Sequence, residues 1–125
     1  MPLTILYVED SKFVSDAVKD TLEAEGWRVE TCADGYVAAL LIHRETRYDL
    51  IILDNELPNV NGLELARRVR SLAHRKQTPI IMLSASECAR DARLAGVNEF
   101  LRKPQDIGKI VETVARLLNT SSGLS

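Results

Sequence analysis

The sequence has few cysteines, no long apolar run and no excess of charge of either sign. Its two cysteines, Cys32 and Cys88, are far apart and form no Cys-x-x-Cys pair, so we expect reduced packing residues rather than a disulfide or a metal site. No segment approaches the roughly 20 apolar residues of a membrane span. The 16 Lys and Arg residues nearly balance 18 Asp and Glu residues, which removes the electrostatic reason to expect binding to nucleic acid or a membrane surface.

The start of the sequence also lacks the basic-then-apolar pattern of a secretory leader, so we expect a cytoplasmic location. The length of 125 residues allows one domain, and the 46% hydrophobic and 27% charged residues are typical of a globular protein. We expect this domain to span residues 1–119 and a polar tail to follow at residues 120–125.

Short apolar segments alternate with helical patterns along the chain. The predicted strands are Thr4–Val8, Arg28–Cys32, Leu50–Leu53, Pro79–Leu83 and Asn98–Leu101. The predicted helices centre on residues 14–22, 37–41, 63–72, 88–95 and 105–118. Each crossover between parallel strands packs a helix on one face of the sheet, so this alternation predicts a doubly wound α/β fold with a five-stranded parallel sheet and helices on both faces.

In such sheets the ligand site lies at the carboxyl ends of the strands. The chemistry-bearing residues at these ends are Glu9, Asp10, Asp54, Ser84 and Lys103. Three carboxylates in one pocket repel each other unless a cation is present, and an oxygen-only ligand set favours Mg²⁺, or Mn²⁺, over zinc. A lysine and a hydroxyl beside such a metal suit phosphoryl transfer, with Asp54 as the nucleophile.

At these positions the chain closely resembles the receiver domain of two-component response regulators, including the single-domain chemotaxis type. The motifs are Glu9-Asp10, Asp54-x-x-Leu57-Pro58-x-x-x-Gly62, Leu83-Ser84-Ala85 and Phe100-Leu101-Arg102-Lys103-Pro104. Each motif alone is weak, but all four occur in order and each stands at a strand exit. The resemblance covers about residues 3–118 and implies a flavodoxin-like sheet with strand order 2-1-3-4-5.

The resemblance implies that Asp54 is the phosphoacceptor, modified to 4-aspartylphosphate by the phosphohistidine of a histidine kinase or a histidine phosphotransfer protein. Glu9, Asp10 and Asp54 would hold Mg²⁺ together with the backbone carbonyl of Glu56. Lys103 would pair with the phosphoryl oxygens. The domain would therefore be a signalling module that catalyses only its own phosphorylation and dephosphorylation, not an enzyme with a separate substrate.

The resemblance also implies a conformational switch. Ser84 would swing toward the phosphoryl group, Phe100 would turn inward, and the bond before Pro104 would be cis. This shift would remodel a partner-binding surface formed by the predicted segments 88–95, 98–101 and 105–118. The sequence departs from the commonest pattern with Ser84 where Thr is frequent and Phe100 where Tyr is frequent. Glu56 adds a fourth carboxylate, and we hypothesise that it tunes the lifetime of the phosphorylated state, by positioning water or by competing for Lys103.

Several of these residues have simpler interpretations. Asp10 is also a favoured helix N-cap, and Phe100 is also an ordinary core residue. Phe13 suits packing slightly better than a docking contact. Two further groups are expected on the solvated surface: the basic cluster Arg67, Arg68, Arg70, Arg75 and Lys76, and the histidines His43 and His74.

Two other functions and one other origin of the chain remain as alternatives. A haloacid-dehalogenase-like phosphatase also uses Mg²⁺ and a strand-end Asp, but Asp54-Asn55-Glu56 lacks its second Asp. A flavin or nucleotide binder would need a Gly- or Ser-rich loop where Glu9-Asp10 stand. The chain could also be a receiver domain cut from a larger regulator or hybrid kinase. As it stands, we expect it to signal through an unidentified downstream protein, without DNA or membrane binding.

Overall fold

The computed structural model describes residues 2–121, and its five strands form one parallel sheet in the order β2-β1-β3-β4-β5. This arrangement confirms the predicted doubly wound fold and its strand order. The strands are β1 (Thr4–Val8), β2 (Arg28–Cys32), β3 (Leu50–Leu53), β4 (Ile80–Ser84) and β5 (Glu99–Arg102). The helices are α1 (Lys12–Glu23), α2 (Gly35–His43), α3 (Gly62–Ser71), α4 (Ala89–Leu94) and α5 (Ile110–Ser121), with a 3₁₀ helix, η1 (Ile107–Lys109), before α5.

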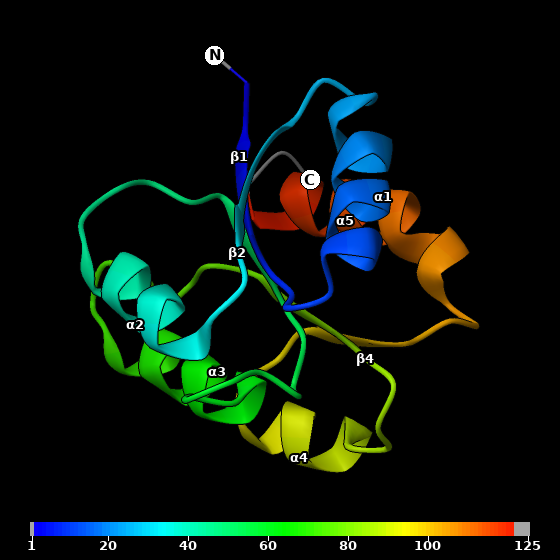
Figure 1. Cartoon of the computed structure of the whole chain (residues 1–125). Coiled ribbons are helices and arrows are strands. Elements are labelled where there is room, and N and C mark those ends of the chain that lie inside the picture. Colours follow the sequence, from blue (N-terminus) through cyan, green and yellow to red (C-terminus); the bar gives the residue numbers. More distant parts are fainter. Residues whose placement is uncertain (1, 122–125) are drawn as a thin grey trace.

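Helices cover both faces of the sheet, with α1 and α5 on one face and α2, α3 and α4 on the other (Figure 1). Because side chains alternate along a strand, β1 sends Leu6 and Val8 into one hydrophobic core and Ile5 and Tyr7 into the other. The central strands β1, β3 and β4 are therefore almost continuously apolar, as is usual for strands that helices cover on both faces. The charged side chains Glu9 and Asp54 stand directly after β1 and β3, and Ser84 is the last residue of β4.

Local signals in the sequence set the helix ends. The side chains of Ser11, Asp34 and Asn61 each accept a hydrogen bond from a first-turn N–H of α1, α2 and α3. Gly26 and Gly96 follow α1 and α4 with φ of 92° and 98°, a region that favours glycine. The side-chain caps therefore mark where α1, α2 and α3 start, and the two glycines mark where α1 and α4 end.

Several predicted boundaries differ from the structure. The last helix begins at Ile110 rather than Gln105, because the Asp106 carboxylate turns back to accept a hydrogen bond from the Arg102 N–H at 3.0 Å. The predicted strands Pro79–Leu83 and Asn98–Leu101 each lie one residue later, at β4 and β5. Helix α5 extends to Ser121 and residues 122–125 lie outside the described residues, so the division into a domain at 1–119 and a tail at 120–125 stays a prediction.

The expectation that the basic cluster is a solvated surface is wrong for Arg75. Its side chain is only 2% exposed, and its guanidinium donates to the carbonyl oxygens of Ile42 at 2.6 Å, Arg44 at 2.7 Å and Thr46 at 2.7 Å. The guanidinium carbon also lies 4.8 Å from the centre of the Tyr48 ring. A planar fork of N–H donors can satisfy several carbonyls at once, so Arg75 ties the end of α2 to the segment after α3.

Arg70, in the same cluster, is also partly buried. It donates to the carbonyl oxygens of Thr78 at 2.7 Å and Gly96 at 3.0 Å, and to the side chain of Asn98 at 2.9 Å. Arg70 therefore joins α3 to the segments before β4 and β5. His43 and His74 are exposed, as predicted.

Candidate functional site

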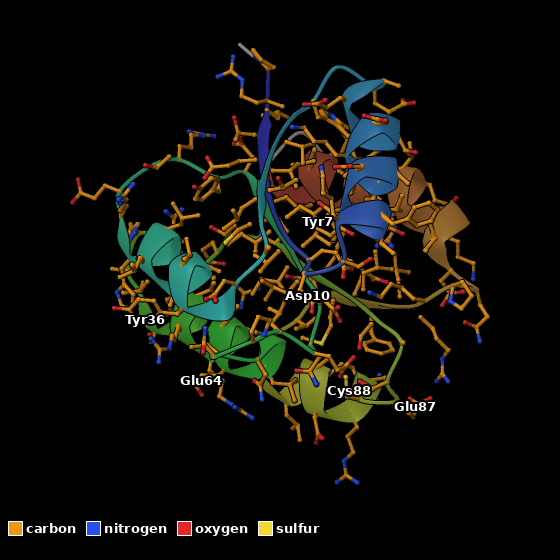
Figure 2. All side chains as sticks on the ribbon, viewed as in Figure 1. Tyr7, Asp10, Tyr36, Glu64, Glu87 and Cys88 are labelled. Carbon is orange, nitrogen blue, oxygen red and sulfur yellow. The ribbon has the colours of Figure 1, made fainter. Side chains whose placement is uncertain are left out.

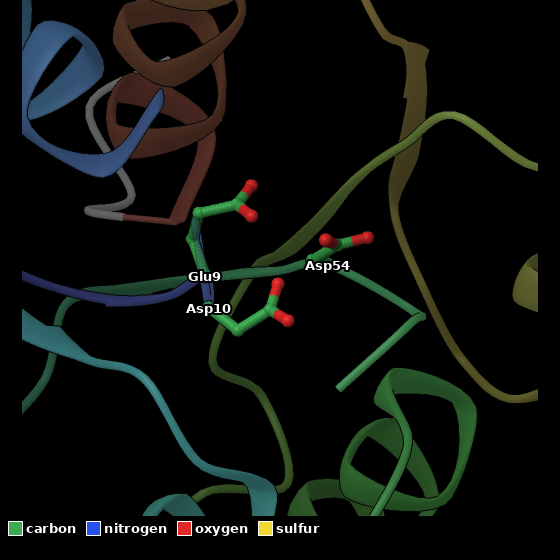
Figure 3. Close-up of side chains that lie close together, drawn as sticks. All are labelled: Glu9, Asp10 and Asp54. Atoms are coloured by element: carbon green, nitrogen blue, oxygen red, sulfur yellow. The ribbon is translucent and has the colours of Figure 1, made fainter. Parts of the chain in front are cut away.

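The three predicted carboxylates meet at the carboxyl end of the sheet. Glu9 and Asp10 directly follow β1 and Asp54 directly follows β3, and these strands pair in register with Val8 opposite Leu53. One carboxylate oxygen from each residue lies within 4.8 Å of the others, and Figure 3 shows the side chains approaching one another. Glu9 and Asp54 are only 2% and 4% exposed, whereas Asp10 is exposed. The predicted convergence of these residues is therefore present.

The alternative interpretation of Asp10 as the N-cap of α1 is wrong. Ser11 is the N-cap, since its hydroxyl oxygen accepts a hydrogen bond from the Val14 N–H at 3.4 Å. The Ser11 N–H in turn donates to the Glu9 carboxylate at 3.1 Å. The start of α1 therefore orients Glu9 and leaves the Asp10 carboxylate available to a cation.

Lys103 lies among the same carboxylates. Its ammonium nitrogen is 2.7 Å from Glu9 Oε1 and 3.2 Å from Asp54 Oδ2. Burial alone would lower the pKa of Lys103, but its hydrogen bond to Glu9 and the charges of Asp54 and Glu9 raise the pKa instead. The Lys103–Pro104 peptide bond is cis, as the family resemblance implied.

Asp54 has an unfavourable environment for its charge. Burial, followed by repulsion from Glu9, raises the pKa of Asp54 to about 6, although Lys103 opposes this shift. A single ammonium group thus leaves the negative charge of the cluster incompletely compensated. A divalent cation would relieve the repulsion, and carboxylate oxygens are the ligands that Mg²⁺ prefers, so the residues fit a magnesium site.

The loop after Asp54 folds tightly against the site. Gly62 donates its N–H to the carbonyl of Asn55 at 3.1 Å, and a side chain at Gly62 would collide with the backbone of Asp54 and Asn55. The Asn55 side chain accepts a hydrogen bond from the Leu63 N–H at 3.1 Å. This close approach explains the glycine of the Asp54-to-Gly62 motif. The role of the Glu56 carbonyl as a metal ligand stays a prediction.

Ser84, at the end of β4, is fully buried and bound to Glu56. Its hydroxyl donates to Glu56 Oε1 at 3.0 Å, while the Ser86 hydroxyl lies 2.5 Å from Glu56 Oε2. Burial would raise the pKa of Glu56, but the hydrogen bonds from Ser86, Ser84 and Asn55 lower it. Sequence reasoning missed Ser86, and its spacing of two residues from Ser84 was the available signal.

The two phenylalanines differ in exposure. Phe100 on β5 is half-buried against the core beneath α3 and α4, so its inward turn stays a prediction. Phe13, in the first turn of α1, is 85% exposed. The preferred interpretation of Phe13 as a packing residue is therefore wrong.

Comparison with known proteins identifies the class of this fold and site. The family model of the response regulator receiver domain matches residues 5–115, so the chain belongs to this family of two-component signalling domains. This membership favours the signalling hypothesis over the phosphatase and nucleotide-binder alternatives.

Individual relatives agree with the family assignment. The chain is 30% identical to the polar-differentiation response regulator DivK of Brucella anthropi, covering 94% of this chain and 98% of DivK. It is also 31% identical to a protein of Mycobacterium tuberculosis named as the probable transcriptional regulatory protein TcrX. The match covers 94% of this chain but only 50% of TcrX. The chain likewise spans about half the length of several other curated relatives that it matches.

Solved structures give the same picture. The receiver domain of the sensor histidine kinase PA1611 from Pseudomonas aeruginosa matches with a TM-score of 0.84 and 30% identity, covering 95% of this chain and 99% of that domain. That structure has a magnesium ion coordinated in its active site cleft. The chemotaxis regulator CheY4 of Vibrio cholerae matches with a TM-score of 0.85 and 31% identity, covering 94% and 99%. Over the described residues, no helix of this chain has the length and apolarity needed to cross a membrane.

Proposed function

We propose that this chain accepts a phosphoryl group on Asp54 from the phosphohistidine of a histidine kinase or a histidine phosphotransfer protein. The observation that carries this proposal is the convergence of Asp54 with Glu9, Asp10 and Lys103 at one end of the sheet. Buried carboxylates with a single lysine beside them repel one another unless a cation is bound. A site that binds a divalent cation together with an anionic group accounts for this arrangement.

Glu9, Asp10 and Asp54, with the backbone carbonyl of Glu56, would hold Mg²⁺, and Mn²⁺ suits the same oxygen ligands. When bound, the cation supplies positive charge that offsets the charge on the transferred group. These few protein ligands leave room for water and for phosphoryl oxygens. The magnesium in the related PA1611 receiver domain supports this assignment.

The reaction follows from the positions of the side chains. A carboxylate oxygen of Asp54 attacks phosphorus, the phosphorus–nitrogen bond of the donor histidine breaks, and the imidazole leaves. Lys103 already contacts the acceptor carboxylate at 3.2 Å, so its ammonium can follow the new charge onto the phosphoryl oxygens. Ser84 donates its hydroxyl to another phosphoryl oxygen, and Phe100 turns into the space that Ser84 leaves.

This shift would alter the surface formed by α4, β5 and α5, through which a downstream protein would bind. Glu56 would tune the lifetime of the phosphorylated state. We place the protein in the cytoplasm. We propose that it catalyses only its own phosphorylation and dephosphorylation and acts on no separate substrate. Relatives of equal length and of twice the length both occur, so a single-domain regulator and the receiver module of a longer regulator or hybrid kinase both fit.

A small phosphodonor such as phosphoramidate tests the proposal. Intact-mass spectrometry should show one added phosphoryl group that requires Mg²⁺ and is absent from Asp54→Asn. Asp20→Asn, which changes an exposed carboxylate on α1, is the matched control and should be modified like the wild type. An adduct that persists in Asp54→Asn, or that forms equally well in excess chelator, would contradict the assignment.

A further inference from the structure

Both side chains proposed to contact the phosphoryl group are already bound to carboxylates. Lys103 is bound to Glu9 and Asp54, the groups that surround the acceptor. Ser84 is instead bound to Glu56, whose carboxylate lies on the loop after β3. Lys103 needs only a small shift within the cluster to reach the phosphoryl group. Ser84 must first break its hydrogen bond to Glu56, which lies outside that cluster.

The contacts of Glu56 hold that partner in place. The Ser86 hydroxyl lies 2.5 Å from Glu56 Oε2, and the Asn55 side-chain amide donates to the same oxygen at 3.3 Å. The Ser86 N–H also donates to the Ser84 hydroxyl oxygen at 3.2 Å. Both oxygens of the Glu56 carboxylate are therefore used, one by Ser84 and the other by Ser86 and Asn55.

A serine hydroxyl has a single proton to donate. While Ser84 donates this proton to Glu56, it cannot donate it to a phosphoryl oxygen. Hydrogen bonds to a charged acceptor are stronger than those between neutral groups, and full burial of Ser84 keeps water from replacing the lost partner. The Glu56 carboxylate and the phosphoryl group therefore compete for the same donor.

We propose that Glu56 is a positioning residue that holds the Ser84 hydroxyl in the unphosphorylated arrangement, and that Ser86 fixes the Glu56 carboxylate for this task. We call Glu56, Ser84 and Ser86 the serine latch. This inference rests on the proposed function, because it presumes that Ser84 contacts the phosphoryl group. It differs from competition for Lys103, since Glu56 acts on the hydroxyl donor and makes none of the hydrogen bonds described for that lysine.

Beryllofluoride with Mg²⁺, a mimic of the phosphoryl group on Asp54, tests the serine latch at equilibrium. Glu56→Ala should bind beryllofluoride about tenfold more tightly than the wild type, the scale of one hydrogen bond to a charged group. Ser86→Ala should give a smaller gain, because Asn55 still donates to the Glu56 carboxylate. Glu45→Ala, which removes an exposed carboxylate in the loop after α2, is the matched control and should bind as the wild type does.

The double variant Glu56→Ala/Ser84→Ala separates the serine latch from simple charge repulsion. If Glu56 acts through Ser84, adding Glu56→Ala to Ser84→Ala should produce no further gain in affinity. A tenfold gain that persists without the Ser84 hydroxyl would assign the effect to repulsion and overturn the inference.

Two further results would also contradict the serine latch. Beryllofluoride binding by the wild type with no gain in Glu56→Ala would overturn the serine latch and leave the proposed function standing. Failure of beryllofluoride to bind the wild type any better than Asp54→Asn would overturn both. A nuclear magnetic resonance readout adds a direct check. The Ser86 amide resonance of unliganded Glu56→Ala should shift toward its position in the beryllofluoride-bound wild type, because that amide donates to Ser84.

Discussion

Replacing Asp54 with Asn should stabilise the metal-free protein at neutral pH. The asparagine side chain keeps the shape of the aspartate and removes a charge that burial and Glu9 disfavour. The pKa of Asp54 is about 6 against an ordinary value of 3.8. At about 1.4 kcal/mol per pKa unit, the ionised carboxylate disfavours the fold by about 3 kcal/mol above pH 6. The pKa of about 6 already includes the favourable contact of Asp54 with Lys103, so we expect Asp54→Asn to gain about 3 kcal/mol.

The sign of the pH dependence follows from proton binding. The folded state binds the Asp54 proton more tightly than the unfolded state, so wild-type stability falls as the pH rises from about 4 to about 6. The advantage of Asp54→Asn should therefore be complete above about pH 6 and shrink to roughly a third at about pH 4.5.

Urea denaturation in the presence of a chelator measures both quantities. The free energies of unfolding of wild type and Asp54→Asn are compared at about pH 7.5 and about pH 4.5. Asp20→Asn, an exposed change on α1, should show no comparable gain. The reasoning is refuted if Asp54→Asn is the less stable protein at neutral pH, or if its advantage is the same at both pH values.

Three further predictions concern the metal affinity and the stability of the protein. At the proposed Mg²⁺ site, protons would compete with the cation for Asp54, so the apparent Mg²⁺ affinity measured by calorimetry should fall as the pH drops through about 6, and a flat profile would contradict this. Arg75→Lys replaces a planar fork by a point charge and should lower the free energy of urea unfolding by about 2 kcal/mol, whereas Arg67→Lys on the exposed face of α3 should change it little. Tyr7, between the sheet and α1 (Figure 2), has a buried hydroxyl that lies near the Glu9 carboxylate but makes no hydrogen bond of good geometry among the described residues. Tyr7→Phe should therefore stabilise the protein by about 1 kcal/mol, and a clear loss of stability would show that the hydroxyl is bonded.

The fold was predictable because each element carries its own local signal. Runs such as Leu50–Leu53 are too apolar for any position except a strand covered on both faces. The main carboxylates were predictable for a related reason. A polar residue that directly ends such a run has only the carboxyl edge of the sheet to occupy, so Glu9, Asp54 and Ser84 were identified together.

The features that the sequence did not reveal depend on contacts between distant segments. Arg75 has the same letter as its solvated neighbour Arg67, and only the folded arrangement of three carbonyls around its guanidinium distinguishes the two. The contacts of Glu56 depend likewise on which way its side chain turns in the loop. Phe13 was misjudged because periodicity marks the buried face of a helix only to within about one residue.

Arg70, which is partly buried, and Arg75, which is fully buried, make one end of the domain more rigid than the other. Their guanidinium groups tie helix ends and loops to backbone carbonyls at one pole of the domain, away from Asp54. At the opposite pole, side-chain hydroxyls and carboxylates make the comparable links, and these can exchange partners without unfolding anything. Phosphorylation of Asp54 should therefore move the loops around it, while the end of the sheet that Arg70 and Arg75 hold keeps its structure.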